Sequence, residues 1–132
     1  MDSEIKKIIQ ESTFEIQGGR FVYVKALKAP SVEGHFMVSK DDDEITVITK
    51  EENLSGLTLA ERNKDFYRLI ALNVSIPFYA VGFLAAVSQA IAKDGMNILI
   101  VSTYSKDYIL IKDEKVEDAR NVLLKLGFNE RR

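Results

Sequence analysis

The feature that most limits the fold of this 132-residue chain is an uncharged stretch in its middle, from Leu69 to Ala92. Such a stretch is long enough to cross a membrane, since a spanning helix takes about 20 apolar residues. Polar and helix-breaking residues interrupt it, however: Asn73, Ser75, Pro77, Gly82, Ser88 and Gln89. We therefore expect a strand, a turn and a helix here, and no membrane span.

Two periodicities divide this stretch at Pro77. Before it, apolar residues alternate as on one face of a β-strand, at Ile70, Leu72, Val74 and Ile76. After it, they recur at helical spacing, at Leu84, Ala85, Ser88, Ile91 and Ala92. Pro77 has no N–H group to donate and favours extended geometry in the residue before it, so it suits the end of the strand.

The predicted helix is unusually poor in polar groups. From Ala80 to Ala92 its only polar side chains are Ser88 and Gln89. A surface helix normally keeps one polar face. We therefore expect a second side of this helix to be covered, either by another part of the chain or by a second copy, and we predict a homodimer.

The composition argues against several classes of function. The net charge is −2 and the basic residues are dispersed, so the basic surface of a nucleic-acid-binding protein is missing. The chain has no cysteine, which excludes disulfides, thiolate zinc sites and a cysteine nucleophile. We expect no cofactor.

The charged segment from Met1 to Ser12 lacks the apolar core of a signal peptide, and we expect a cytoplasmic protein.

Two polar features suggest sites that we do not expect. The acidic run from Asp41 to Glu44 lacks the alternating ligands and the glycine of an EF-hand loop, so a solvated turn is the better interpretation. His35 is the only histidine and has no Ser or Cys nucleophile pattern near it. We interpret it as a loop side chain, and we predict no metal site and no catalytic residue.

The first half of the chain predicts a short helix and several strands. Asp2 or Ser3 caps a helix that carries isoleucines on one face. Residues 17–19 turn the chain between strands 14–16 and 21–27, which we expect to form a hairpin. Two further strands are expected at 36–39 and 44–49. Residues 51–65 are polar and weakly helical, and we expect a domain boundary at their end.

The second half is more regular and has the order βαββα. The expected elements are strand 67–76, helix 81–94, strand 97–104, strand 108–112 and helix 115–126. A βαββαβ unit needs one more strand, yet few residues follow Phe128. That strand must come from the N-terminal half or from another subunit, because an open edge invites pairing. We therefore predict two interlocked halves, 1–65 and 66–132.

Residues 81–110, VGFLAAVSQAIAKDGMNILIVSTYSKDYIL, resemble the ACT domain, and especially small proteins with two such domains in tandem. The marks of the resemblance are Gly82 near the helix start, DGMNI at 94–98, IVSTY at 100–104 and DYILIK at 107–112. The first half matches only loosely, through GGRFVYV and TLAE. The resemblance implies an α+β protein built from ferredoxin-like βαββαβ units in tandem, with an antiparallel sheet and helices on one face.

The resemblance also implies that an amino acid or a similar small metabolite binds at a domain or subunit interface. The ligand of such a domain lies beside the loop after the first strand and the start of the first helix, where a glycine and free helix amides suit a carboxylate. The implied ligand-binding residues are Tyr79, Val81, Gly82, Phe83, Asn97, Ile98, Thr103 and Tyr104. Regulatory ACT domains often hold the ligand's amino group with Asp or Asn in that loop, whereas this chain has Phe78, Tyr79 and Ala80.

Two functions remain open. The first is a non-enzymatic sensor that acts on a separate protein partner. The second is a structural oligomerisation module whose pocket is filled by Phe78, Tyr79 and Phe83. Packing is the more favoured role for these aromatic residues and for Tyr104 and Tyr108. An acylphosphatase-like enzyme is disfavoured, since the 77–82 loop has no Arg.

Overall fold

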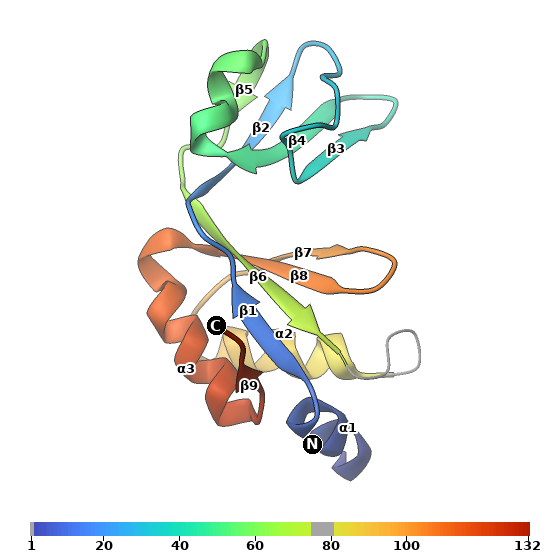
Figure 1. The fold of residues 1–132 in the computed structure, drawn as a ribbon, viewed down its shortest axis with the longest axis vertical. Coiled ribbons are helices and arrows are strands. Elements are labelled where there is room, and N and C mark those ends of the chain that lie inside the picture. Colours follow the sequence, from blue (N-terminus) through green and yellow to red (C-terminus); the bar gives the residue numbers. More distant parts are fainter. Residues whose placement is uncertain (1, 75–80) are drawn as a thin grey trace. The chain divides into compact units, whose positions relative to one another are not determined.

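The computed structural model describes residues 2–74 and 81–132, which belong to two compact units (Figure 1). Unit 1 comprises the residues up to Gly18 together with Arg68–Arg132. Unit 2 comprises Gly19–Tyr67. Among the described residues, no helix has the length and apolar character needed to cross a membrane. The predicted boundary at residue 65 stays a prediction.

The sheet of unit 1 has the strand order β9-β1-β6-β8-β7. Its strands are β1 (Thr13–Ile16), β6 (Tyr67–Asn73), β7 (Leu99–Ser102), β8 (Asp107–Lys112) and β9 (Asn129–Glu130). β1 runs antiparallel to β6, with Phe14 opposite Leu72. The sequence left two sources open for the missing strand, the N-terminal half or another subunit. In the structure β1, from the N-terminal part of the same chain, takes this place.

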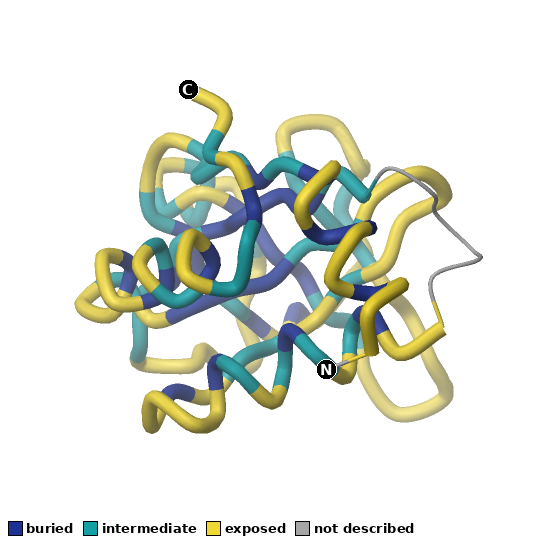
Figure 2. Tube along the Cα trace, turned by 90° about the horizontal axis from the view of Figure 1, so that it is seen from below, coloured by how far each residue is buried: buried dark blue, intermediate teal, exposed yellow. Residues whose placement is uncertain are grey.

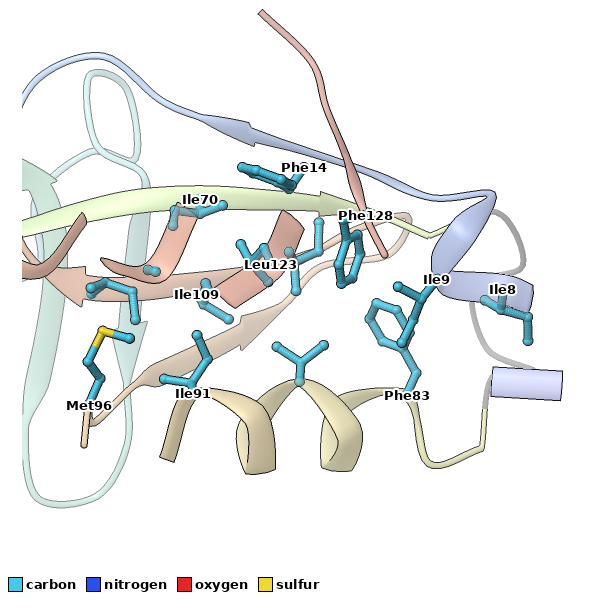
Figure 3. Packing of buried hydrophobic residues seen from close by; sticks show 14 of the residues in the cluster. Ile8, Ile9, Phe14, Ile70, Phe83, Ile91, Met96, Ile109, Leu123 and Phe128 are labelled. Atoms are coloured by element: carbon cyan, nitrogen blue, oxygen red, sulfur yellow. The ribbon is translucent and has the colours of Figure 1, made fainter. Parts of the chain in front are cut away.

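Three helices, α1 (Ser3–Gln10), α2 (Phe83–Lys93) and α3 (Val116–Leu126), cover one face of this sheet. Their buried residues form one core with alternate residues of β6 and β8, which all point to the same face (Figure 3). The helices are buried along one side and exposed along the other (Figure 2). The core members at the centre of this layer are Ile9, Phe14, Ile70, Leu72, Val87, Ile91, Ile109, Ile111 and Leu123.

The predicted hairpin between residues 14–16 and 21–27 is wrong. β1 pairs with β6 and β9 in unit 1, whereas β2 (Phe21–Ala26) pairs with β4 and β5 in unit 2. Gly19 does adopt a positive φ of 83°, as a turn glycine would. The chain bends at residues 18–19 but does not reverse there, because β1 and β2 both run antiparallel to β6. Strand partners are decided by the edges that distant parts of the chain offer.

A short strand, β9, follows α3 where the sequence predicts none. The Asn129 N–H group donates to the Ser12 carbonyl at 3.2 Å, and the Arg131 N–H group donates to the Phe14 carbonyl at 2.8 Å. The Glu130 carboxylate accepts from Arg120 Nε of α3 at 3.0 Å. Glu117 and Glu130 beside this guanidinium raise its pKa above the ordinary value. These bonds fix the C-terminal residues along β1.

Unit 2 has four antiparallel strands in the order β5-β2-β4-β3. Besides β2 they are β3 (Met37–Lys40), β4 (Ile45–Lys50) and β5 (Leu59–Arg62), with a 3-10 helix η1 at Glu51–Gly56. The weak helicity expected within 51–65 is found in η1, but β5 was not expected. All four residues of β5 are exposed, so it has no apolar alternation by which the sequence could reveal it.

The two units share one strand order. If the strands of unit 2 are numbered along the chain, their order across the sheet is 4-1-3-2. The same order results in unit 1 when β6, β7 and β8 are numbered first and β1 takes the fourth place. Unit 2 has the loop 27–36 and η1 where unit 1 has helices. The prediction of an α+β protein with ferredoxin-like units is confirmed for the strand order of both units, whereas α-helices cover one face of the sheet in unit 1 alone.

A buried threonine holds the loop of unit 2 in place. Thr49 Oγ1 donates to the Gly34 carbonyl at 3.2 Å and lies 2.9 Å from His35 Nδ1. Asn53 Nδ2 of η1 donates to the same carbonyl at 2.8 Å. His35 is thus a loop side chain with a structural bond to β4.

Replacement of Thr49 by valine is expected to destabilise the protein by about 1–2 kcal/mol, because it removes a buried hydroxyl and leaves its partners without that bond. Urea denaturation followed by circular dichroism measures the change. The control is Thr46→Val on the same strand, since Thr46 is partly exposed and should tolerate the substitution. Equal effects of the two variants would contradict the role given to Thr49.

Candidate functional site

A pocket of about 260 Å³ lies in unit 1 where α2 begins. Its walls come from three segments: the residue after β6, the start of α2 and the turn between β7 and β8. The residues that line it are Val74, Val81, Phe83, Leu84, Ser102, Thr103, Tyr104, Ser105, Lys106 and Asp107. One side of the pocket is therefore apolar, and the other carries hydroxyl groups and one charge of each sign.

The helix side of the pocket is the N-terminus of α2. Gly82 is the N-cap residue, with φ 87°, and no side chain caps the helix there. The Ala86 N–H group donates to the Gly82 carbonyl at 3.0 Å, which begins the helical hydrogen bonds. The first N–H groups of a helix have no partner within it and attract negative charge. This end of α2 therefore favours a carboxylate.

Gly82 is required for its backbone conformation and not for space, because an added Cβ would meet no atom of residues 2–74 or 81–132 within 4 Å. The alternative that this glycine permits close packing of helix against sheet is therefore wrong.

Gly82→Ala is expected to lower the free energy of unfolding by about 1–2 kcal/mol, since alanine is strained at positive φ. Thermal denaturation measures the loss. Gly56→Ala, where φ is ordinary and the space is also open, is the control and should change stability little.

The turn side of the pocket is held by hydrogen bonds within residues 102–107. The Thr103 N–H group and Oγ1 both donate to the Lys106 carbonyl, at 2.8 and 3.1 Å. Ser102 Oγ donates to Asp107 Oδ1 at 2.6 Å across the strand pair. The backbone beside Lys106 and the Asp107 carboxylate are thereby fixed in position.

The structure brings together four of the residues expected to bind a ligand. Val81, Phe83, Thr103 and Tyr104 line the pocket. Gly82 adjoins it but lines a neighbouring groove instead. The other expected residues lie elsewhere: Asn97 is exposed beyond the end of α2, Ile98 packs against the core, and Tyr79, like Phe78, lies outside the described residues.

Four polar residues of the pocket were missed by sequence reasoning, namely Ser102, Ser105, Lys106 and Asp107. The sequence signal that could have indicated these residues is the expected tight turn at 105–107, which contains two charged residues. It points to no pocket by itself, because charged residues in turns are usually solvated. Only the position of the turn beside the start of α2 makes these groups part of a site.

The aromatic residues of the site differ in burial. Phe83 is a core residue, 2% exposed, and its ring meets Phe128 edge-on at 5.8 Å between centroids. Packing, the favoured interpretation of Phe83, is therefore confirmed. Tyr104 is 85% exposed at the tip of the turn, so the cross-strand packing expected of it is not observed. Tyr108 lies opposite Val101 in the strand pair and is partly buried.

The outer side of α2 is open within the described part of the chain. The helix buries Phe83, Val87 and Ile91 and leaves Ala85, Gln89 and Ala92 exposed. A groove of about 580 Å³ runs along this side. Its lining residues are Asp2, Ile5, Val81, Gly82, Ala85, Ala86, Gln89, Ala90, Lys93 and Leu126. Coverage of this side by a second copy stays a prediction.

The acidic run in unit 2 forms a local turn. The N–H groups of Asp43 and Glu44 donate to Asp41 Oδ1 at 2.8 and 2.9 Å, which lowers the pKa of the Asp41 carboxyl below its ordinary value. All residues of the run are exposed. Within residues 2–74 and 81–132, no three His, Cys, Asp or Glu side chains are grouped as metal ligands would be.

Proteins of known structure share this fold. The chain is 22% identical to a protein of unknown function from Vibrio cholerae, with a TM-score of 0.80 over 94% of this chain and 96% of that one. A protein from Agrobacterium tumefaciens is 19% identical, with a TM-score of 0.66 over 91% and 92% of the two chains. The regulatory subunit of aspartate kinase from Thermus thermophilus, in its ligand-free form, is 12% identical, with a TM-score of 0.61 over 87% and 95%.

No curated protein matches the sequence. The sequence profile of the ACT domain, in contrast, matches residues 63–125. That range contains β6, α2, β7 and β8 and nearly all of α3, so it includes every segment that lines the pocket. The sequence match and the fold agree with each other, and residues 63–125 of this chain match the ACT domain.

Proposed function

We propose that this protein is a non-enzymatic regulatory protein that binds an amino acid or a similar small metabolite in the pocket at the start of α2. The observation that carries the proposal is the division of the pocket into an apolar side and a polar side with one cation and one anion. A small dipolar molecule with an apolar part matches this division. The fold is shared with a regulatory subunit of aspartate kinase, which supports a regulatory role.

The chemistry of the pocket favours binding over turnover. Its described lining residues include no histidine and no cysteine, and the Ser102 hydroxyl is engaged with Asp107. The N-terminus of α2 attracts a carboxylate without any proton transfer. We therefore expect a bound ligand to change the assembly of the protein or the activity of a separate protein partner in the cytoplasm.

Self-association is part of the proposal. Val81 and Tyr104, at the mouth of the pocket, are 87% and 85% exposed, and the outer side of α2 is rich in alanine. Contiguous apolar surface of this kind marks an interaction site. A homodimer that covers it would place the pocket close to a subunit interface. Native mass spectrometry tests this, and a monomer at every concentration would contradict it.

A thermal shift screen of the twenty L-amino acids tests the binding function. A ligand present at a hundred times its dissociation constant stabilises the folded state by about 2.7 kcal/mol, which is easily measured. The matched control is the D-enantiomer of each ligand that raises the melting temperature. If no amino acid shifts the transition and the dimer is intact, the structural oligomerisation module is the better description.

A further inference from the structure

We infer that the turn between β7 and β8 recognises both charges of the ligand. Asp107 would bind the α-ammonium group and Lys106 the α-carboxylate, while the apolar side of the pocket would take an uncharged side chain. The inference rests on the proposed function, and it assigns the ammonium partner that the sequence left without a candidate. It narrows the ligand to a zwitterionic amino acid with an apolar side chain.

The Asp107 carboxylate keeps acceptor positions that a ligand can use. Oδ1 accepts from Ser102 Oγ at 2.6 Å, and the side chain forms no ion pair with any residue in 2–74 or 81–132. An ionised carboxylate has about four acceptor positions, so most of them are available to a ligand. Asp107 is partly buried, where a charge-assisted bond to an ammonium group is stronger than in water.

Lys106 supplies the opposite charge from the adjacent position. Its carbonyl accepts two bonds from Thr103, which fix the backbone, while its side chain is exposed and pairs with no acidic residue in the described segments. The N-terminus of α2 faces the same pocket. A carboxylate between the Lys106 ammonium and this helix end would be attracted by both.

The remaining walls select the ligand's side chain. Val74, Phe83 and Leu84 bring no polar side-chain atom to the pocket. A charged or amide side chain placed against them would lose its hydration without gaining a hydrogen bond, which is unfavourable. An aliphatic side chain would instead be transferred from water to an apolar surface. The volume of about 260 Å³ accommodates a molecule of the size of leucine.

Isothermal titration calorimetry with L-leucine and two analogues tests the assignment. The analogues are leucinamide, which lacks the carboxylate, and 4-methyl-2-oxopentanoate, which lacks the ammonium group. Asp107→Asn keeps the acceptor for Ser102 but removes the charge, and should weaken leucine and leucinamide by at least about tenfold while leaving the oxo acid unchanged. Lys106→Met should weaken leucine and the oxo acid and leave leucinamide unchanged.

The controls are Asp118→Asn and Lys125→Met, which make the same substitutions at exposed positions of α3 outside the pocket, and which should bind leucine like the wild type. Equal melting temperatures of all variants exclude unfolding as a cause. Leucine binding by both pocket variants within twofold of the wild type would overturn the inference and leave the proposed function standing. Binding of a charged amino acid in preference to leucine would overturn the apolar class. A wild type that binds no amino acid would overturn the proposed function itself.

Discussion

Replacement of Phe14 by alanine is expected to lower the free energy of unfolding by about 3–5 kcal/mol, the typical cost of truncating a fully buried phenylalanine. Phe14 is 0% exposed, and its ring meets Phe128 edge-on at 6.3 Å between centroids. It lies in β1 opposite Leu72 of β6. Because domains are stable by only about 5–15 kcal/mol, this one substitution removes a large share of the stability.

The effect of Phe14→Ala tests whether the N-terminal strand is an integral part of unit 1. Urea denaturation gives the change in the free energy of unfolding, and an unchanged slope would show that both proteins unfold in the same way. The control is Leu124→Ala on α3, where the side chain is 44% exposed and the loss should be within about 0.5 kcal/mol. If Phe14→Ala were as mild as this control, β1 would not be packed as described.

Replacement of Phe83 by alanine is also expected to destabilise the protein by about 3–5 kcal/mol. The ring is 2% exposed and packs against Phe128 in the core, although the residue also borders the pocket. This variant decides between two roles, because a residue that merely fills the pocket could be truncated with little loss of stability. Thermal denaturation without ligand measures the loss.

Tyr104→Ala is the control for Phe83→Ala, since both residues line the pocket but Tyr104 is exposed. It should leave the free energy of unfolding within about 0.5 kcal/mol of the wild type. A stable Phe83→Ala protein would mean that the ring is not part of the core and would favour the structural module, in which aromatic residues occupy the pocket.

The regular elements of unit 1 could be predicted because each carries its own periodicity. The helices predicted at 81–94 and 115–126 are found at Phe83–Lys93 and Val116–Leu126. Their buried residues recur three to four positions apart, which depends only on local helical geometry. The expected strand at 67–76 is found at Tyr67–Asn73.

Elements without an apolar pattern were not predictable. β5 is exposed at every position and β9 has two residues, so neither shows an alternation. Both exist because they hydrogen-bond to a strand edge formed by a distant segment, β2 for β5 and β1 for β9. The pairing of Phe14 with Leu72 is equally non-local, and the nearby glycines favoured the wrong partner for β1.

The candidate site divides in the same way. Val81, Phe83, Thr103 and Tyr104 were expected from the resemblance to a family and do line the pocket. Lys106 and Asp107 were not expected, because their spacing resembles that of any solvated turn. Their proposed role depends on the distance between that turn and the start of α2, which no local pattern contains.

The sequence by itself determined that the uncharged stretch from Leu69 to Ala92 is a strand followed by a helix. It did so because alternation and helical spacing are local properties of the chain. Only the tertiary structure decided that β1 completes the sheet beside β6 and that Lys106 and Asp107 lie at the N-terminal end of α2. Strand pairing and pocket formation bring together segments far apart in sequence, and burial and hydrogen bonding between those segments select the arrangement.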